Sequence, residues 1–313
     1  MSKRTRKYRS FNKTNLISFC LFVLIVLVCL AFSPTDDTFG EYVQAPKENA
    51  ETVADTNYNY VHFIDAGQGD STLIETSDGK FALIDASTQS CTSEVLEYLN
   101  NKGVEKLEFV LFTHPHEDHI GGGDEVLKSF DVKTVFMTDR TENTSAYSNL
   151  IKELTRIKNE KGTSIIRPEN DDTFKLGNIV FTVISDGKKY ESTNNSSICV
   201  RAELGETSLL FTGDAEAEVE NDILQSTAEI DSDIYKCAHH GSSTSNSQAF
   251  LDQVSPEIAI VSCGEGNTYG HPHKEVVDAM RERNIPLLRT DIHGNIVIAF
   301  NDGSFFLCDS NSK

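Results

Sequence analysis

The sequence predicts one α/β domain in which two sheets are covered by helices. Two observations favour this class: short apolar runs bounded by Gly, Asp and Asn recur as strand patterns, and segments with helical periodicity lie between them. With 313 residues and 38% hydrophobic content, the chain can bury a sizeable core. No repeat of fixed period is visible, so we expect strands and helices to alternate within a single fold.

Each predicted element follows from its own local pattern. The first group of strands is expected at residues 60–64, 71–75, 81–84, 109–112 and 134–137, and the second at 179–184, 197–204, 208–211, 258–261, 295–299 and 304–307. Helices are expected at residues 93–101, 147–159, 215–225 and 273–284. Because the strands fall into two groups, we expect two sheets.

The first 33 residues consist of a basic tail and an apolar segment. Six Lys and Arg residues precede the apolar run 16–32, whose length is near the lower limit for crossing a bilayer. An uncleaved signal anchor is favoured over a cleaved secretory signal, because Pro34 directly follows the small-residue pattern that ends at Ser33. The basic tail predicts a cytoplasmic N-terminus, and hence a single-pass protein of the cell membrane whose remaining chain is extracellular; secretion is the alternative.

The remaining chain divides into a linker and an acidic domain. Residues 34–57 are polar with little apolar periodicity, as expected for a linker, and the folded domain is expected at residues 58–313. Without the six N-terminal basic residues, 22 basic and 48 acidic residues remain, a formal balance of −26. Such a charge offers no extended positive face and weakens any high-affinity hold on duplex DNA. The seven cysteines are scattered and odd in number, which favours buried thiols over a disulfide framework.

A histidine-rich loop follows one of the predicted strands. It places His114, His116, Asp118 and His119 within six residues. Imidazole and carboxylate together suit Zn²⁺ or a similar divalent ion, and the three glycines at 121–123 would let a helix begin close to the site. Four ligands so close in sequence divide into two pairs, His114 with His116 for one ion and Asp118 with His119 for a second.

Two later segments offer the remaining ligands. The strand at 208–211 leads to Asp214, which could bridge both ions, although a helix N-cap explains a carboxylate there about as well. Another strand leads to His239 and His240, one of which could complete the shell of the second ion. The sequence does not decide between these two histidines, and we favour His239. Zn²⁺ is the expected metal, with Mn²⁺ as the alternative.

Together, these residues resemble the metallo-β-lactamase fold, and within it the extracytoplasmic domain of ComEC/Rec2-type competence proteins. The matching motifs, in the family's order, are Phe63-Ile64-Asp65-Ala66-Gly67-Gln68-Gly69-Asp70-Ser71, Leu83-Ile84-Asp85, residues 113–122, Asn194-Asn195-Ser196-Ser197, Thr212-Gly213-Asp214, His239-His240-Gly241-Ser242 and Tyr269-Gly270-His271-Pro272. The resemblance implies a four-layer αββα sandwich with a two-metal site at one edge of the sheets. It also implies a phosphodiesterase or nuclease that uses a hydroxide bridging two divalent metal ions.

The sequence departs from that family in two respects. The wider fold supplies a third histidine to the first ion, but no histidine occurs between His119 and His239. By similarity to the competence-type domains, Asn194 or Asn195 would take that place. The polytopic channel of competence proteins also has no counterpart, since only one apolar segment exists, so we expect no DNA transport by this chain alone.

Further residues have expected roles in this chemistry. Asp118 would position the hydroxide as well as bind metal, and His271 would contact the substrate phosphate or protonate the leaving group. Ser242 could bind phosphate oxygens. Three carboxylates at strand ends or turns could orient the metal-bound imidazoles, or simply cap backbone N–H groups: Asp65, Asp70 and Asp85.

Three classes of function compete for this domain. The first is a phosphodiesterase that acts on nucleic acid or on phosphate esters of the cell surface, with the membrane as its only other partner. The second is a hydrolase of β-lactams, lactones or other esters, which uses related metal loops. The third is a binding domain that kept the fold and lost its chemistry. The loop around His116 and the pair His239-His240 favour the first.

Overall fold

A computed structural model describes residues 58–188 and 190–308, which lie in one compact unit. The predicted tail, anchor and linker at residues 1–57 lie outside the described residues. Among the residues that are described, no helix is both long and apolar enough to span a bilayer. The first element among the described residues is the strand β1 (Asn59–Phe63).

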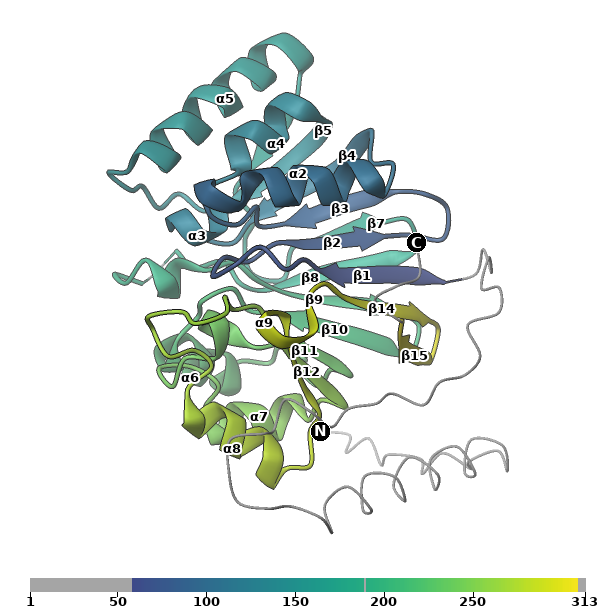
Figure 1. The fold of residues 1–313 in the computed structure, drawn as a ribbon, viewed down its shortest axis with the longest axis vertical. Helices are drawn as coiled ribbons and strands as arrows, with labels where there is room; N and C mark the ends of the chain where they lie inside the picture. The colour runs from purple at the N-terminus through teal and green to yellow at the C-terminus, as the bar shows by residue number, and fades with distance from the viewer. Residues whose placement is uncertain (1–57, 189, 309–313) are drawn as a thin grey trace. The chain divides into compact units, whose positions relative to one another are not determined.

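Two sheets form the centre of this unit (Figure 1). The eight-stranded sheet has the order β15-β14-β1-β2-β3-β4-β5-β6, and the seven-stranded sheet has the order β13-β12-β11-β10-β9-β8-β7. The strands of the first sheet are β1 (Asn59–Phe63), β2 (Thr72–Glu75), β3 (Phe81–Ile84), β4 (Lys106–Phe112), β5 (Asp131–Met137), β6 (Ser164–Ile166), β14 (Ile296–Asn301) and β15 (Ser304–Leu307). Those of the second are β7 (Thr173–Leu176), β8 (Ile179–Ser185), β9 (Cys199–Leu204), β10 (Thr207–Phe211), β11 (Ile234–Lys236), β12 (Ile258–Val261) and β13 (Leu287–Arg289).

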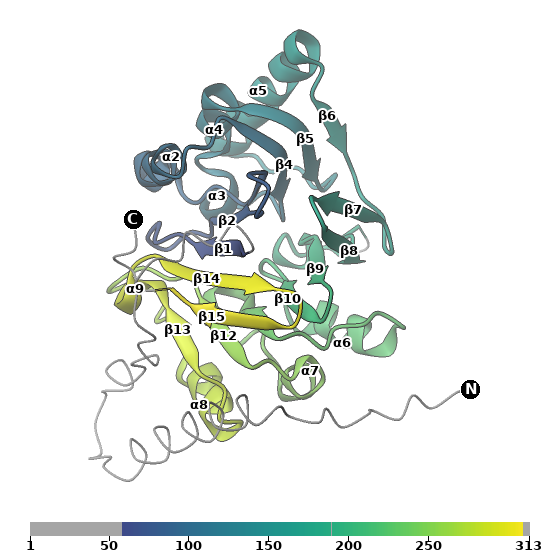
Figure 2. The same ribbon diagram turned by 90° about the vertical axis from the view of Figure 1, so that its right-hand side faces the viewer.

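Helices cover the outer face of each sheet, as Figures 1 and 2 show from two directions. The first sheet carries α2 (Thr92–Asn101), α3 (Glu117–Ile120), α4 (Gly123–Ser129) and α5 (Ser145–Lys161). The second carries α6 (Ala217–Gln225), α7 (Gln248–Val254) and α8 (Lys274–Glu282), and the short α9 (Thr290–His293) follows β13. In the described part of the chain, three 3-10 turns lie near strand ends: η2 (Gln89–Cys91), η3 (Asn194–Ser196) and η4 (Ala238–Gly241).

Alternation along the strands separates three apolar clusters. In β1, Val61 and Phe63 face the other sheet and pack with residues such as Phe181 of β8, which forms the core between the sheets. Leu99 of α2 belongs to a cluster on the outer face of the first sheet, and Phe250 of α7 to one on the outer face of the second. The four layers are therefore helix, sheet, sheet and helix, as the sequence predicts.

The predicted elements differ from the observed ones mainly where segments are short. The long helix predicted at 147–159 is α5 (Ser145–Lys161), which extends two residues beyond the predicted bounds at each end. Neither β7 nor β13 is predicted, because four and three residues are too few to establish a period. The seven-residue α7 is missed for the same reason.

The sheet topology brings several loops to one edge. Strands β3, β4 and β5 run parallel in the first sheet, and β10, β11, β12 and β13 run parallel in the second. Parallel strands end at the same edge of a sheet. The segments that follow β3, β4, β10, β11 and β12 therefore converge, and they carry the histidines and carboxylates singled out above.

Candidate metal centre

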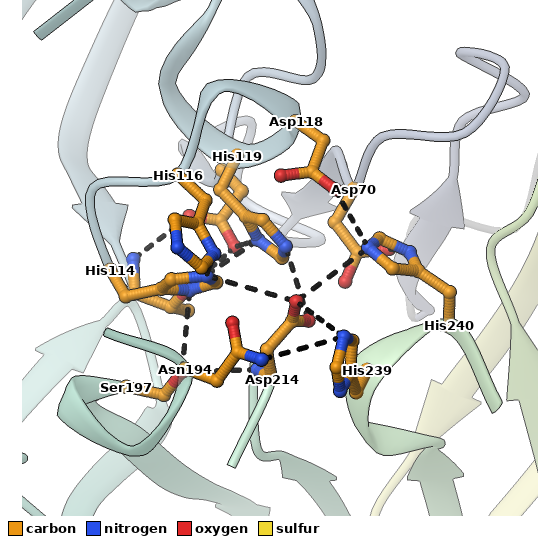
Figure 3. A network of polar contacts seen from close by, with 12 residues as sticks. Asp70, His114, His116, Asp118, His119, Asn194, Ser197, Asp214, His239 and His240 are labelled. Carbon is orange, nitrogen blue, oxygen red and sulfur yellow. Dashed lines mark hydrogen bonds and ion pairs between the residues drawn. The ribbon is translucent and has the colours of Figure 1, made fainter. Parts of the chain in front are cut away.

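Three groups of described side chains lie close enough to hold a metal ion, and two of them share Asp214 (Figure 3). The third consists of Asp70, Asp85 and His119, and it lies behind His119. One ligand atom from each of Asp118, His119, Asp214 and His240 lies within 4.8 Å of the others. The second group, with the same spacing, is His114, His116 and Asp214. The division into two sets therefore follows the pairs expected from the sequence, and the carboxylate after β10 lies between them.

Asp214 is almost completely buried and faces histidines from both groups. Its Oδ1 lies 3.1 Å from His119 Nε2, and its Oδ2 lies 3.7 Å from His114 Nε2 and 3.8 Å from His240 Nε2. The Asp214 backbone N–H donates to Ser197 Oγ at 3.0 Å, and that hydroxyl lies 3.3 Å from His114 Nδ1. Asp214 is thus held where it can serve both groups, rather than as a helix N-cap, since α6 begins only at Ala217.

Close backbone packing allows the histidine loop to reach this position. The short helix α3 carries Asp118 and His119 and lies against η2. A Cβ added at Gly121 would lie 2.3 Å from the Gln89 backbone nitrogen, so only glycine allows this approach.

His119 is oriented by a buried carboxylate behind it. Its Nδ1 donates to Asp85 Oδ2 at 2.8 Å, and the Thr113 backbone N–H and hydroxyl donate to the same carboxylate, each at 2.8 Å. The proton on Nδ1 leaves His119 Nε2 as the ligand atom, directed at Asp214. Such a carboxylate behind a ligating imidazole is usual in metal sites. Asp70 also lies near this pair, but Asp85 makes the direct hydrogen bond.

His240 is held by a different set of contacts. Its Nδ1 donates to the Ser262 carbonyl at 3.1 Å and lies 3.5 Å from Asp70 Oδ1. Its Nε2 faces Asp118 Oδ2 at 3.3 Å. Asp70 in turn accepts a 2.8 Å hydrogen bond from Lys236 Nζ, and both side chains are buried. The sequence patterns above do not identify Lys236 as part of the site; its one signal is a charged residue at the end of the otherwise apolar strand β11.

An unusual backbone turn decides which of the two adjacent histidines enters the site. His239 and His240 both have left-handed conformations, with φ of 51° and 53°. Asn246 holds this turn: its amide donates to the Ala238 and Ser242 carbonyls at 3.0 and 3.2 Å, and its Oδ1 accepts from the Ala238 N–H at 3.1 Å. His240 is buried as a result, and His239 stays at the margin with 20% of its side chain exposed.

The choice of His239 as a ligand therefore does not match the geometry. His239 belongs to neither ligand group; its Nδ1 lies 3.1 Å from Thr244 Oγ1, and its Nε2 lies 3.8 Å from Asp214 Oδ2. Two other expected residues also lie apart from the ligands. Asp65 is exposed and hydrogen-bonds the Gly67 backbone, and Ser242 Oγ pairs with Thr244 Oγ1 at 3.0 Å.

The structure distinguishes between the two adjacent asparagines of η3. The amide of Asn195 is fully engaged, because its Nδ2 donates to Glu218 at 3.0 Å and its Oδ1 accepts from the Glu216 N–H at 2.8 Å. By contrast, Asn194 Oδ1 is buried without a hydrogen-bond partner. Figure 3 shows this oxygen pointing toward the space between His116 and Asp214. Asn194 is therefore the asparagine that could add a ligand to the first group.

His271 lies at the mouth of the site in a fixed tautomer. The Gly264 N–H donates to Gln68 Oε1 at 3.1 Å, which turns the Gln68 amide nitrogen toward His271 Nδ1, 3.3 Å away. His271 Nδ1 is thus an acceptor, and its Nε2 carries the proton. Burial, together with the charges of His240 and His239, lowers the pKa of His271 to about 4. At neutral pH this ring is an uncharged hydrogen-bond donor.

The ionisation of the centre fits the binding of cations. Burial raises the pKa of Asp118, but the contact with His240 and the charges of His119 and His240 together outweigh burial and bring that pKa to about 2. Burial lowers the pKa of His240, yet Asp214 and Asp70 raise it to about 10. His119 Nε2 and Asp214 Oδ1 lie 3.1 Å apart, and His240 Nε2 lies 3.3 Å from Asp118 Oδ2, but none of the first three atoms makes a well-directed hydrogen bond although all three are buried. Buried polar atoms seldom lack a well-directed partner, so their convergence favours a metal ion between them.

Metal binding at this centre is expected to release protons. An ion requires the imidazoles without their Nε2 protons, whereas the carboxylates hold His119 and His240 protonated in the metal-free protein. The apparent affinity for Zn²⁺ should therefore rise about tenfold per pH unit for each displaced proton, between about pH 6 and pH 8. Titration calorimetry in buffers of different protonation enthalpy measures both quantities.

The same raised pKa values have a consequence for the metal-free fold. The folded protein binds the His240 proton more tightly than the unfolded chain does, so protonation of His240 stabilises the metal-free fold below the ordinary His pKa. This stabilisation is lost as pH rises toward about 10.

The predicted pH dependence of metal binding can be contradicted directly. A Zn²⁺ affinity that does not change with pH, with no release of protons, would contradict this ionisation of His119 and His240.

Comparisons with known proteins agree with the fold. The family model described as the metallo-beta-lactamase superfamily matches residues 64–265. ComE operon protein 3 of Bacillus subtilis is 30% identical over 254 residues, which cover 75% of this chain and 32% of that protein. Recombination protein 2 of Haemophilus influenzae is 30% identical over 253 residues, covering 77% of this chain and 29% of that protein. The chain thus spans about a third of the length of these relatives.

Solved structures give a more distant likeness. A diphosphatase of the PhnP family has a TM-score of 0.46 at 13% identity, covering 80% of this chain and 99% of that one. Igni18, a metallo hydrolase from Ignicoccus hospitalis, also has a TM-score of 0.46, at 15% identity, covering 80% of this chain and 98% of that one. The resemblance to competence proteins predicted from the motifs is confirmed by the sequence relatives. The chain belongs to the metallo-beta-lactamase superfamily.

Proposed function

We propose that this protein is a metal-dependent phosphodiesterase with a two-ion centre. The observation that carries the proposal is the shared carboxylate: Asp214 belongs to two separate groups of ligands, and both consist of imidazole and carboxylate alone. Two ions bound side by side can neutralise the charge of a phosphodiester on both its attacking and its leaving oxygen. Zn²⁺ suits the histidine-rich donor set, and Mn²⁺ is the alternative.

Each group of residues has a distinct part in this assignment. His114 and His116 would hold the first ion with the amide oxygen of Asn194, and Asp118, His119 and His240 would hold the second. Asp214 would contact both. When bound, the two ions supply Lewis-acid stabilisation of phosphoryl charge and a water molecule of lowered pKa.

Two further residues act on the reacting groups. The Asp118 side chain is 29% exposed and ionised, so it can accept a hydrogen bond from the attacking water and orient it. The tautomer of His271 set by Gln68 presents an N–H group, which can donate to a phosphoryl oxygen. Contact with the phosphate is therefore the role that we assign to His271, in preference to protonation of the leaving group.

The substrate is expected to be short or held at a surface. The acidic charge of the chain does not favour binding a long polyanion. The names of the relatives, a recombination protein and competence proteins, support nucleic acid as one substrate class, and phosphate esters of the cell surface are the other. We further propose that the catalytic domain is extracellular and tethered by the N-terminal segment.

The test compares a phosphodiester with a β-lactam. The purified full-length chain, loaded with Zn²⁺ or Mn²⁺, is expected to hydrolyse bis-p-nitrophenyl phosphate and single-stranded DNA, but not a chromogenic cephalosporin. His116→Ala and Asp118→Ala should each lower phosphodiester hydrolysis at least about a hundredfold, because each loses a metal contact. His293→Ala, which changes a histidine bonded to the Arg289 backbone, is the matched control and should retain activity.

Two outcomes count against the proposal. Turnover of the cephalosporin alone would replace phosphodiester hydrolysis with β-lactam hydrolysis. Unchanged activity in both His116→Ala and Asp118→Ala, with circular dichroism spectra like that of the wild type, would defeat the metal mechanism.

A further inference from the structure

We propose that Tyr269 is a stacking platform for a nucleobase of the substrate, next to the metal centre. The proposal rests on the proposed function, since it names the group attached to the phosphodiester. It concerns a binding contact that the hydrolytic chemistry itself does not use. Four lines of observation support it: the alignment of rings, the fixed turn, the exposure of the side chain and the local charge.

Three rings form a row from the surface to a metal ligand. The Tyr269 ring stacks on His271, with centroids 5.6 Å apart and planes 20° apart. His271 in turn stacks on His240, with centroids 6.1 Å apart and planes 22° apart. His240 belongs to the candidate second ion site. A ring placed on Tyr269 therefore continues a row that ends at the centre, within reach of a phosphate bound there.

The turn that carries Tyr269 is fixed by hydrogen bonds on both sides. The Asn267 amide donates to the Gly264 and His271 carbonyls at 3.0 and 2.7 Å, and the His271 N–H donates to Asn267 Oδ1 at 2.9 Å. His273 Nε2 donates to the Tyr269 carbonyl at 3.2 Å, while its Nδ1 accepts from the Ser243 N–H at 2.9 Å. The backbone of Tyr269 is thereby joined to the loop that holds His240, so little ordering remains to be done on binding.

The side chain itself is exposed to solvent. Tyr269 is 65% exposed, the highest value among the large hydrophobic side chains that are exposed in the described part of the chain. One face of the ring rests on His271, which leaves the rest of the side chain available to a ligand. Aromatic side chains in such positions stack with bases, and this contact does not depend on base identity because every base has a π-face.

The local charge favours a neutral ring over a second phosphate. Between β12 and α8, the sequence carries one formally charged side chain apart from histidine, Glu265. A phosphate on this side would meet the Glu265 carboxylate, whereas a base would meet an aromatic ring. We therefore assign this side of the site to the base.

The test measures binding of product-like probes, so it does not depend on turnover. Thymidine 5′-monophosphate and deoxyribose 5-phosphate share the sugar phosphate and differ in the base. The metal-loaded full-length wild type should bind the nucleotide roughly tenfold more tightly, as expected for one stacked base. Tyr269→Ala should remove this preference, and Tyr269→Phe should keep it. Phe306→Ala, which removes an exposed ring of β15, is the matched control and should bind like the wild type.

Clear results would overturn the platform. Equal affinity of the wild type for the two probes, including binding of neither, would do so, as would an unchanged preference in Tyr269→Ala. Failure of the proposed function looks different. A wild type that prefers the nucleotide and hydrolyses no phosphodiester retains the platform and loses the phosphodiesterase assignment.

Discussion

Asp214→Asn is expected to lower phosphodiester hydrolysis at least about a thousandfold, the largest loss of activity among the variants considered. The amide keeps the shape of the side chain and removes its charge, and Asp214 is the residue common to both ligand groups. Loss of the charge that holds two ions forfeits several kcal/mol of transition-state stabilisation, and about 4 kcal/mol corresponds to a thousandfold change in rate. Elemental analysis of the purified variant should show that both ions are lost together.

The metal content of the variants distinguishes a carboxylate that holds both ions from one that is a ligand of a single ion. His116→Ala should remove the first ion and leave the second, because His116 belongs to one group only. Asp252→Asn, which changes an exposed carboxylate paired with Arg283, is the control for the same chemical change and should retain both ions. If Asp214→Asn still binds two ions, the shared carboxylate does not hold them and the role assigned to Asp214 fails.

Most ligand positions were predictable because they follow strand ends. The loop after β4 and the residue Asp214 after β10 each come directly after a buried apolar run, and parallel strands bring such ends to one edge. The position of a residue after a strand end identifies it as a candidate ligand, but does not show which way its side chain points. The sequence therefore predicts His114, His116, Asp118, His119 and Asp214 as neighbours, and the structure brings them together.

The positions that the sequence could not decide depend on contacts from distant residues. Whether His239 or His240 turns inward depends on two left-handed residues held by Asn246, and no local pattern reveals that turn. Asn194 and Asn195 both donate to glutamates near the start of α6, but only the oxygen of Asn195 accepts a hydrogen bond, from the Glu216 N–H. In each case adjacent residues of the same type have different roles, and only packing distinguishes them.

The site also requires the two sheets to keep a fixed position relative to each other. The first sheet supplies His114, His116, Asp118 and His119 through the loop after β4, and the second supplies Asp214 and His240 through the loops after β10 and β11. The core between the sheets fixes this relation, with aromatic contacts such as Phe63 on Phe211, whose centroids are 6.4 Å apart. A centre divided in this way is sensitive to any contact that crosses from one sheet to the other near the ligands.

Lys236 and Asp70 form such a contact, and Lys236→Met is expected to destabilise the metal-free fold by about 3–5 kcal/mol. Lys236 ends β11 of the second sheet, and Asp70 lies just before β2 of the first. Both are buried, so loss of the ammonium leaves the Asp70 carboxylate in the interior without its hydrogen-bonded counter-ion, with His240 Nδ1 still 3.5 Å away, and that is the costly change. Urea unfolding in the presence of a chelator measures the effect at neutral pH.

Acidification should reduce this difference in stability. Burial raises the pKa of Asp70, but the charges of Lys236 and His240 outweigh it and hold that pKa below its usual range. A lowered carboxyl pKa stabilises the fold above the unfolded-state value of about 4, and this stabilisation is lost as pH falls. The gap between wild type and Lys236→Met should therefore narrow below about pH 4.

The partner variant shows whether the unpaired charge is the cause. Adding Asp70→Asn to Lys236→Met removes the carboxylate that lost its partner, so the double variant should recover part of the lost stability. Phosphodiester hydrolysis by the double variant should be about 10- to 100-fold lower than that of the wild type, because His240 has lost the carboxylate beside its Nδ1. A double variant less stable than Lys236→Met would mean that packing of the lysine, rather than its charge, stabilises this junction of the two sheets.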